Sequence, residues 1–125
     1  MISKYNQRNM LTQYIISKGI KVRYCTNLNC CNYFKFNKFE KQINVQQIMN
    51  NNLLFEYAHE IGHALFCLFI NKIKLDFKKT SKYVLFNEFV AWVIGFVICV
   101  RFKINLHGFM NRSIYCLGTY IKHKG

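Results

Sequence analysis

The sequence contains no proline and only five acidic residues among its 125 positions. Any site that needs a carboxylate must therefore use Glu40, Glu56, Glu60, Asp76 or Glu88. Lys and Arg number 18, which gives a formal net charge of +13. This charge favours anionic partners such as nucleic acid, an anionic membrane or an acidic protein substrate. A lysine-rich surface that reflects AT-rich codon usage, with no functional meaning, is the alternative explanation.

The sequence shows neither the apolar stretch of a signal peptide nor an apolar run long enough to span a membrane. The N-terminus has no uninterrupted apolar stretch of the signal-peptide kind, so we expect a chain that starts here and stays in the cytoplasm. The longest apolar run, 89–100, has twelve residues, whereas a membrane-spanning helix needs about 18 or more. We therefore expect this run to be a buried core helix, and we do not expect membrane association. A membrane-associated peptidase that uses 89–100 as an anchor is the minority alternative.

The six cysteines include one cluster, Cys25, Cys30 and Cys31. Without an export signal we expect all six to be reduced. The cluster lacks the two-residue separation of a zinc ribbon and no second pair follows it, so a cysteine metal site is not expected. The role of the cluster stays open.

A chain of this length makes one domain, 1–125. Apolar side chains at helical spacing alternate with extended stretches of period two, which predicts an α+β fold. The predicted helices are 9–18, 53–71, 83–102 and 107–122, and the predicted strands are 20–24, 32–36 and 41–45. Gly19 stands where a helix C′ residue is expected, and the asparagines at 50–52 supply an N-cap for the second helix.

The predicted helix at 53–71 is apolar nearly all round, which is typical of a buried helix. Its few polar side chains are Glu56, His59, Glu60 and His63. These positions are spaced i, i+3, i+4 and i+7, so they lie on one face. The polar groups of a buried helix therefore converge on a single stripe.

His59 and His63 are four residues apart, so both rings can reach one Zn²⁺ at about 2.0–2.1 Å. Glu60 would lie beside the open coordination position, where it can take a proton from water activated by the metal. This is the H-E-x-x-H arrangement of metalloproteases. The alternative is that both histidines are core residues satisfied by backbone or carboxylate partners.

A catalytic tetrahedral zinc needs a third protein ligand. The longer motif with a third histidine is absent, because Phe66 and Phe69 occupy its glycine and histidine places. Glu88 opens an apolar helix, where a carboxylate is costly unless it is paired or bound to metal, so we expect Glu88 to be the ligand. Neutralisation of Glu88 by Lys82 or by the helix N-terminus is the alternative.

Two other carboxylates are weaker candidates for the metal site. Asp76 lies in a lysine-rich connection and would have to fold back onto the site. Glu56 is better interpreted as a group that orients one of the histidines or as a structural residue.

The segments 57–65 (YAHEIGHAL) and 88–92 (EFVAW) resemble the zincin metallopeptidases, specifically the gluzincin-like ImmA/IrrE group of small phage and mobile-element peptidases. Weaker similarities cover 19–24, 43–45 and 116–120. The resemblance implies a minimal zincin-like domain, with a small three-stranded sheet packed on the H-E-x-x-H helix and two or three further helices. It also implies zinc held by His59, His63 and Glu88, with Glu60 as general base.

The resemblance further implies an intracellular endopeptidase that cleaves a protein substrate such as a repressor, bound as an added strand at an edge near 41–45. It assigns no oxyanion donor, and Tyr57, His107 and Tyr120 remain candidates. Imidazole and carboxylate ligands also suit other divalent ions. A nucleic-acid-associated module with a structural or vestigial zinc site is the second hypothesis, favoured by the charge but by no recognisable motif. The sequence gives no information on oligomeric state.

Overall fold

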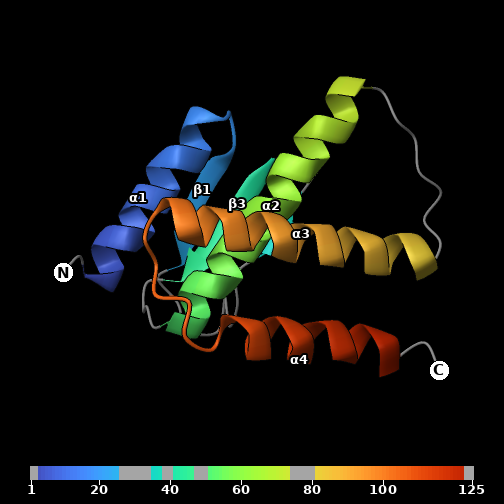
Figure 1. The fold of residues 1–125 in the computed structure, drawn as a ribbon. Helices are drawn as coiled ribbons and strands as arrows, with labels where there is room; N and C mark the ends of the chain where they lie inside the picture. Colours follow the sequence, from blue (N-terminus) through green and yellow to red (C-terminus); the bar gives the residue numbers. More distant parts are fainter. Residues whose placement is uncertain (1–2, 26–34, 38–40, 47–50, 74–80, 123–125) are drawn as a thin grey trace.

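The computed structural model describes residues 3–25, 35–37, 41–46, 51–73 and 81–122, and within them the fold is α+β and mostly helical, as predicted. Helices and short strands follow one another along the chain (Figure 1). The elements are α1 (Lys4–Ser17), β1 (Lys21–Cys25), β2 (Lys35–Asn37), β3 (Gln42–Gln46), α2 (Asn51–Ile73), α3 (Ser81–Arg101) and α4 (Phe109–Lys122).

The strands β1 and β3 pair in parallel, with Val22 opposite Ile43 and Tyr24 opposite Val45. The short strand β2 pairs with β3 in the antiparallel direction, and Phe36 is opposite Ile43. Since β3 has a neighbour on each side along 42–44, it is not an edge there. The expectation that a substrate strand adds near 41–45 is therefore wrong for these residues, because the backbone groups of β3 are already used.

The first helix is longer than its apolar spacing predicts, because its start is set by a polar cap. The Ser3 hydroxyl accepts a hydrogen bond from the Asn6 amide at 3.1 Å, so the helix begins at Lys4. Its end is the one predicted at Gly19, which has a φ of 88°. The amides of Gly19 and Ile20 donate to the carbonyls of Ile16 and Ile15, which is the Schellman pattern.

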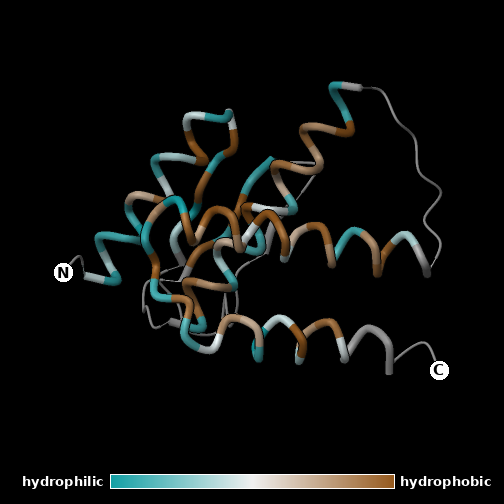
Figure 2. The backbone as a smooth tube through the Cα atoms, viewed as in Figure 1, coloured by the Kyte–Doolittle hydropathy of each residue, from teal (hydrophilic) through white to brown (hydrophobic). Residues whose placement is uncertain are grey.

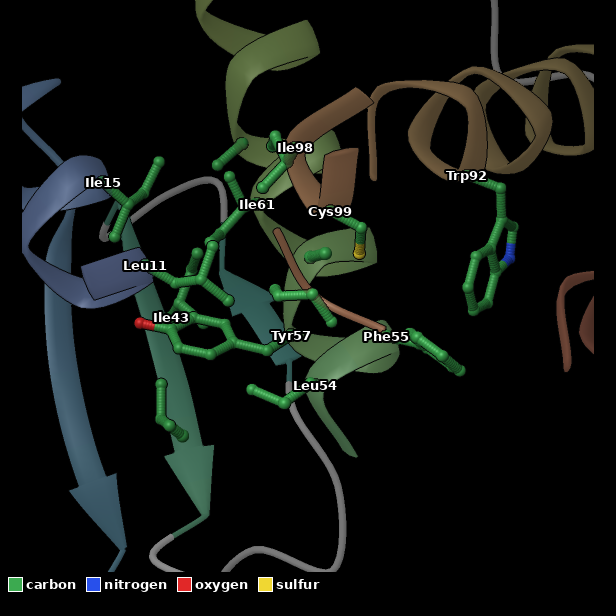
Figure 3. Packing of buried hydrophobic residues seen from close by; sticks show 14 of the residues in the cluster. Leu11, Ile15, Ile43, Leu54, Phe55, Tyr57, Ile61, Trp92, Ile98 and Cys99 are labelled. Carbon is green, nitrogen blue, oxygen red and sulfur yellow. The ribbon is translucent and has the colours of Figure 1, made fainter. Parts of the chain in front are cut away.

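The core lies between the sheet, α1, α2 and the inner side of α3 (Figure 3). Ile43 and Val45 are buried while Gln42 and Asn44 between and beside them are not, so the predicted alternation of β3 is confirmed. Leu11 packs against this face from α1. Each such aliphatic side chain contributes about 1.5–3 kcal/mol on burial.

The helices α2 and α3 cross at close range (Figure 1), and small residues allow it. A Cβ on Gly62 would overlap the carbonyl oxygen of Ala91. A Cβ on Gly95 would lie 3.2 Å from the Ala58 carbonyl, so each helix contributes an alanine and a glycine four residues apart. This packing brings side chains near the crossing into direct contact.

The run 89–100 is only partly the core helix that the sequence predicts. Ala91, Ile98 and Cys99 are buried, but Phe89 and Val97 are more than half exposed. A helix that is apolar all round can bury only the side facing its neighbours, here α2 and α4. The prediction of a fully buried helix is therefore wrong for its other side.

Candidate metal centre

Three of the predicted site residues meet at the α2–α3 crossing. His59 and His63 lie one turn apart on α2, and Glu88 lies on α3. Oε2 of Glu88 is 2.8 Å from Nε2 of His59, and Oε1 is 3.1 Å from Nε2 of His63. One carboxylate therefore contacts both imidazoles, each through a different oxygen.

The spacing of these atoms is slightly tighter than that of the ligands of a tetrahedral metal. Ligand atoms held at about 2.0–2.1 Å from a tetrahedral zinc are roughly 3.3 Å from one another. The two N–O distances, 2.8 and 3.1 Å, are those of hydrogen bonds and are shorter than this value, so the side chains would move apart slightly to admit an ion, and all three are at most 14% exposed. The set of two imidazoles and one carboxylate is also one that zinc binds.

Glu60 lies beside the same histidines in a different position. Its Oε1 is 3.8 Å from Nδ1 of His59, the ring nitrogen that does not contact Glu88. The potential ligand atoms of His59, Glu60 and His63 all lie within 4.8 Å of one another. Two carboxylates can thus be considered as the third ligand, but Glu88 is closer and contacts the Nε2 atoms of both rings, so Glu88 fits the ligand role better.

Charge interactions in the site favour an ionised Glu88. Burial alone would raise the pKa of Glu88, but its hydrogen bonds to His59 and His63 outweigh burial and hold that pKa well below the usual range. Burial lowers the pKa of His59. Burial opposes the charge on His63 as well, yet contact with Glu88 prevails and raises the pKa of His63. An anionic ligand is thus already in place beside the two rings.

Aromatic contacts fix the orientation of His59. Its ring stacks on Trp92 with centroids 4.2 Å apart and planes at 10°, and the ring centroid of His63 lies 4.5 Å away with the planes at 64°. Trp92 in turn packs edge-on against Phe109 of α4. Nε1 of Trp92 is buried with no hydrogen-bond partner within the described ranges. The His59 ring therefore has little freedom to rotate away from Glu88.

Glu56, the fourth polar residue of the α2 stripe, pairs with Arg112 of α4. This contact raises the pKa of Arg112. Of the two roles considered for Glu56, the structural one matches this contact, because the pair joins α2 to α4. Its charge still acts on His59 by raising that pKa slightly against the effect of burial.

Of the remaining candidates, those that the structure describes do not converge on the site. The Tyr57 hydroxyl is 2.6 Å from Oγ1 of Thr12, and Figure 3 shows Tyr57 directed toward Leu11 and Ile43, away from Trp92. His107 is exposed in the connection between α3 and α4. The side chain of Tyr120 lies outside the described residues, as do Asp76 and the Cys25, Cys30 and Cys31 side chains. Cys67, Cys99 and Cys116 form no disulfide among the described residues.

Sequence reasoning did not assign roles to Trp92, Arg112 or Gly62. The position of Trp92, four residues after Glu88, places both on the same helix face and could have indicated it. The repeated alanine–glycine spacing in the second and third helices could have indicated their close crossing. The pairing of Arg112 with Glu56 had no comparable signal, because the two are far apart in the chain.

Neither a protein-family model, nor a curated protein, nor a solved structure matches the chain at the threshold applied. The site must therefore be interpreted from its own chemistry. Two imidazoles and a carboxylate can hold a divalent ion, and a second carboxylate beside them can accept a proton. Groups of these kinds are the ones that metal-assisted hydrolysis uses.

Proposed function

We propose that the protein is a zinc-dependent endopeptidase that cleaves a protein substrate, acting in the cytoplasm. The observation that carries the proposal is the position of Glu88, whose two oxygens contact Nε2 of His59 and Nε2 of His63. Two imidazole nitrogens and a carboxylate meeting at one buried point are the ligand types that a divalent metal such as zinc takes. The proposed domain is of the zincin type, with the sheet β1–β3–β2 beside the H-E-x-x-H helix.

His59, His63 and Glu88 would hold the zinc ion. When bound, zinc polarises a carbonyl group and lowers the pKa of a coordinated water toward roughly 7. Other divalent ions suit the same ligands, so the choice of zinc is itself part of the proposal. Trp92 would keep His59 in the orientation that presents Nε2 to the ion.

Glu60 would be the general base. Its carboxylate is next to His59 without sharing the Nε2 contacts of Glu88, so it would accept the proton from the attacking water. It would then pass that proton to the leaving amine of the cleaved peptide bond. Glu88 cannot take this role in the proposal, because its oxygens face the two ring nitrogens.

The substitution Glu60→Gln tests this function. The amide is close in shape to the carboxylate but cannot accept the proton, so we expect a roughly 10²–10⁴-fold loss of hydrolysis with zinc retained. The measurement is cleavage of a pool of protein-derived peptides, followed by mass spectrometry, with and without a chelator. Activity of the wild-type chain should disappear with the chelator and return with added zinc. Unchanged cleavage by Glu60→Gln would contradict the mechanism.

A further inference from the structure

One side of α3 carries an exposed apolar stripe. Its side chains are each 40–59% exposed, although none carries a polar atom. The members of this α3 stripe are Phe86, Phe89, Val93, Phe96, Val97 and Val100. Figure 2 shows that α3 is mostly hydrophobic after its first turns, which contain hydrophilic residues. Exposed apolar side chains normally occur singly, so a continuous row requires an explanation.

The stripe is narrow and continuous. At 3.6 residues per turn its six members fall within a sector of roughly 100° around the helix axis. With a fully exposed phenylalanine at about 200 Å², the stripe presents on the order of 500 Å² of apolar surface. This is near the upper end of what a monomeric soluble protein usually shows, and patches of this size mark interaction sites.

Basic residues precede and follow the α3 stripe in the sequence. Lys82 stands in the first turn of α3, ahead of the stripe. Arg101 and Lys103, which follow it, are both exposed. Between these ends, 89–100 contains no charged residue. An apolar row with cationic ends matches a surface that is apolar inside and anionic at its boundary.

We propose that the α3 stripe docks this protein on an anionic lipid bilayer, with α3 lying in the plane of the interface. Acyl chains would cover the stripe, and anionic headgroups would neutralise the basic ends. The proposal concerns a different surface from the candidate metal centre and does not depend on peptidase activity.

The net positive charge of the chain and the apolar side chains of the α3 stripe together favour one partner over the others. A second copy seated on the stripe would place basic ends against basic ends in either orientation, in a chain of net charge +13. A nucleic-acid backbone would satisfy the charge but leave the apolar side chains without a partner. An anionic bilayer supplies both kinds of contact.

The bilayer contact is peripheral rather than spanning. Two segments, Asn52–Lys72 and Tyr83–Arg101, are long and apolar enough to cross a bilayer by length and composition. However, the other side of α3 carries Glu88 in contact with His59 and His63, and packs on α2. That side cannot face acyl chains without exposing charged groups to them.

The test is co-sedimentation of the full chain with vesicles. We expect binding to vesicles of phosphatidylcholine with phosphatidylserine, little binding to phosphatidylcholine alone, and weaker binding at high salt. The double variant Val93→Gln/Val97→Gln should lower partitioning at least tenfold, because it puts two amides into the acyl boundary. Circular dichroism checks that this variant folds.

The matched control is Met10→Gln/Ile16→Gln, which changes two exposed aliphatic residues of α1 and should leave partitioning unchanged. Three results would overturn the proposal. One is equal binding by the stripe variant and the wild type, since charge alone would then account for it. Another is a dimer in analytical ultracentrifugation that the stripe variant dissociates. The third is a chain that only detergent extracts from membranes, which would mean that it spans them.

Discussion

His59 is held by contacts with several neighbouring side chains of the candidate site. Its ring is held flat against Trp92 and lies at 64° to the ring of His63, and its Nε2 contacts Glu88. These contacts fix the direction of one ring nitrogen, which is what a metal ligand needs. The same contacts make His59 sensitive to anything that moves α3.

Cys99 gives a test of the core at the scale of one residue. Burial raises the pKa of its thiol from 9.0 to about 12. The unfolded chain loses this proton at lower pH than the folded one, so the contribution of Cys99 to stability should fall as pH rises from about 9 toward 12. In the folded protein at pH 8 we expect iodoacetamide to label Cys99 at least about 100-fold more slowly than in guanidinium, because the thiolate is the nucleophile.

Mass spectrometry of the labelled peptides measures this rate, with Cys67 as internal reference. Cys67 is partly exposed and its label should appear in the folded protein as well. Equal rates for Cys99 and Cys67 under native conditions would mean that α3 does not pack as described.

The sequence allowed the three proposed ligands to be selected, because so few polar residues occur on the apolar helices. His59, His63 and Glu88 each stand out against apolar neighbours, and a buried polar residue needs a partner. The aromatic support by Trp92 and the pairing of Glu56 with Arg112 depend on how α3 and α4 cross α2. The way in which helices cross is a tertiary property, and the residue spacing within one helix does not encode it.

At the scale of secondary-structure elements, Gly62 is the residue that lets α2 and α3 approach. Replacement by alanine places a Cβ against the Ala91 carbonyl, so the helices must separate. We expect Gly62→Ala to lower the free energy of unfolding by about 1–3 kcal/mol and to weaken zinc binding, since Glu88 moves with α3. Urea unfolding and zinc titration measure the two effects.

Gly118→Ala is the matched control, because a Cβ at this position in α4 meets no atom within 4 Å. Alanine is the better helix former, so this variant should gain up to about 1 kcal/mol. If Gly62→Ala were as stable as Gly118→Ala, the close crossing of the two helices would be wrong.

The end of α3 offers a stabilising change. Lys103 has a φ of 56°, and the amides of Lys103 and Ile104 donate to the carbonyls of Val100 and Cys99, the same pattern as at the end of α1. Glycine adopts this conformation without the steric cost of a Cβ, so Lys103→Gly should raise the free energy of unfolding by about 0.5–1 kcal/mol. Thermal unfolding checks this, and Lys103→Ala should show no gain. A loss of stability in Lys103→Gly would contradict the assigned cap.

The prediction of elements from sequence succeeded where apolar periodicity and a turn residue agreed. Gly19 marked the end of α1, and the alternation around Ile43 marked β3. It failed at the start of α1, where the signal is a single serine, and at the position of β3 within the sheet. Strand order depends on pairing between distant segments, which the periodicity of one strand does not encode.

At the scale of the whole molecule, α3 separates two surfaces of opposite character. One side contacts α2 and α4 and holds Glu88 in the candidate metal centre, while the α3 stripe is about half exposed, with Phe86 and Phe96 at its margins touching Phe66 and Phe109. Each of these surfaces alone would need apolar residues on only one side of α3. The composition of 89–100 is explained when one side packs in the protein and the other meets a partner.

The central claim is that His59, His63 and Glu88 together hold a zinc ion. It is tested most directly by the zinc content of the purified chain, measured by elemental mass spectrometry after dialysis. We predict about one zinc per chain for the wild type and for Glu60→Gln, and a loss of zinc in His63→Ala and in Glu88→Ala. Circular dichroism confirms that each variant is folded. Equal zinc in the wild type and Glu88→Ala would contradict the claim.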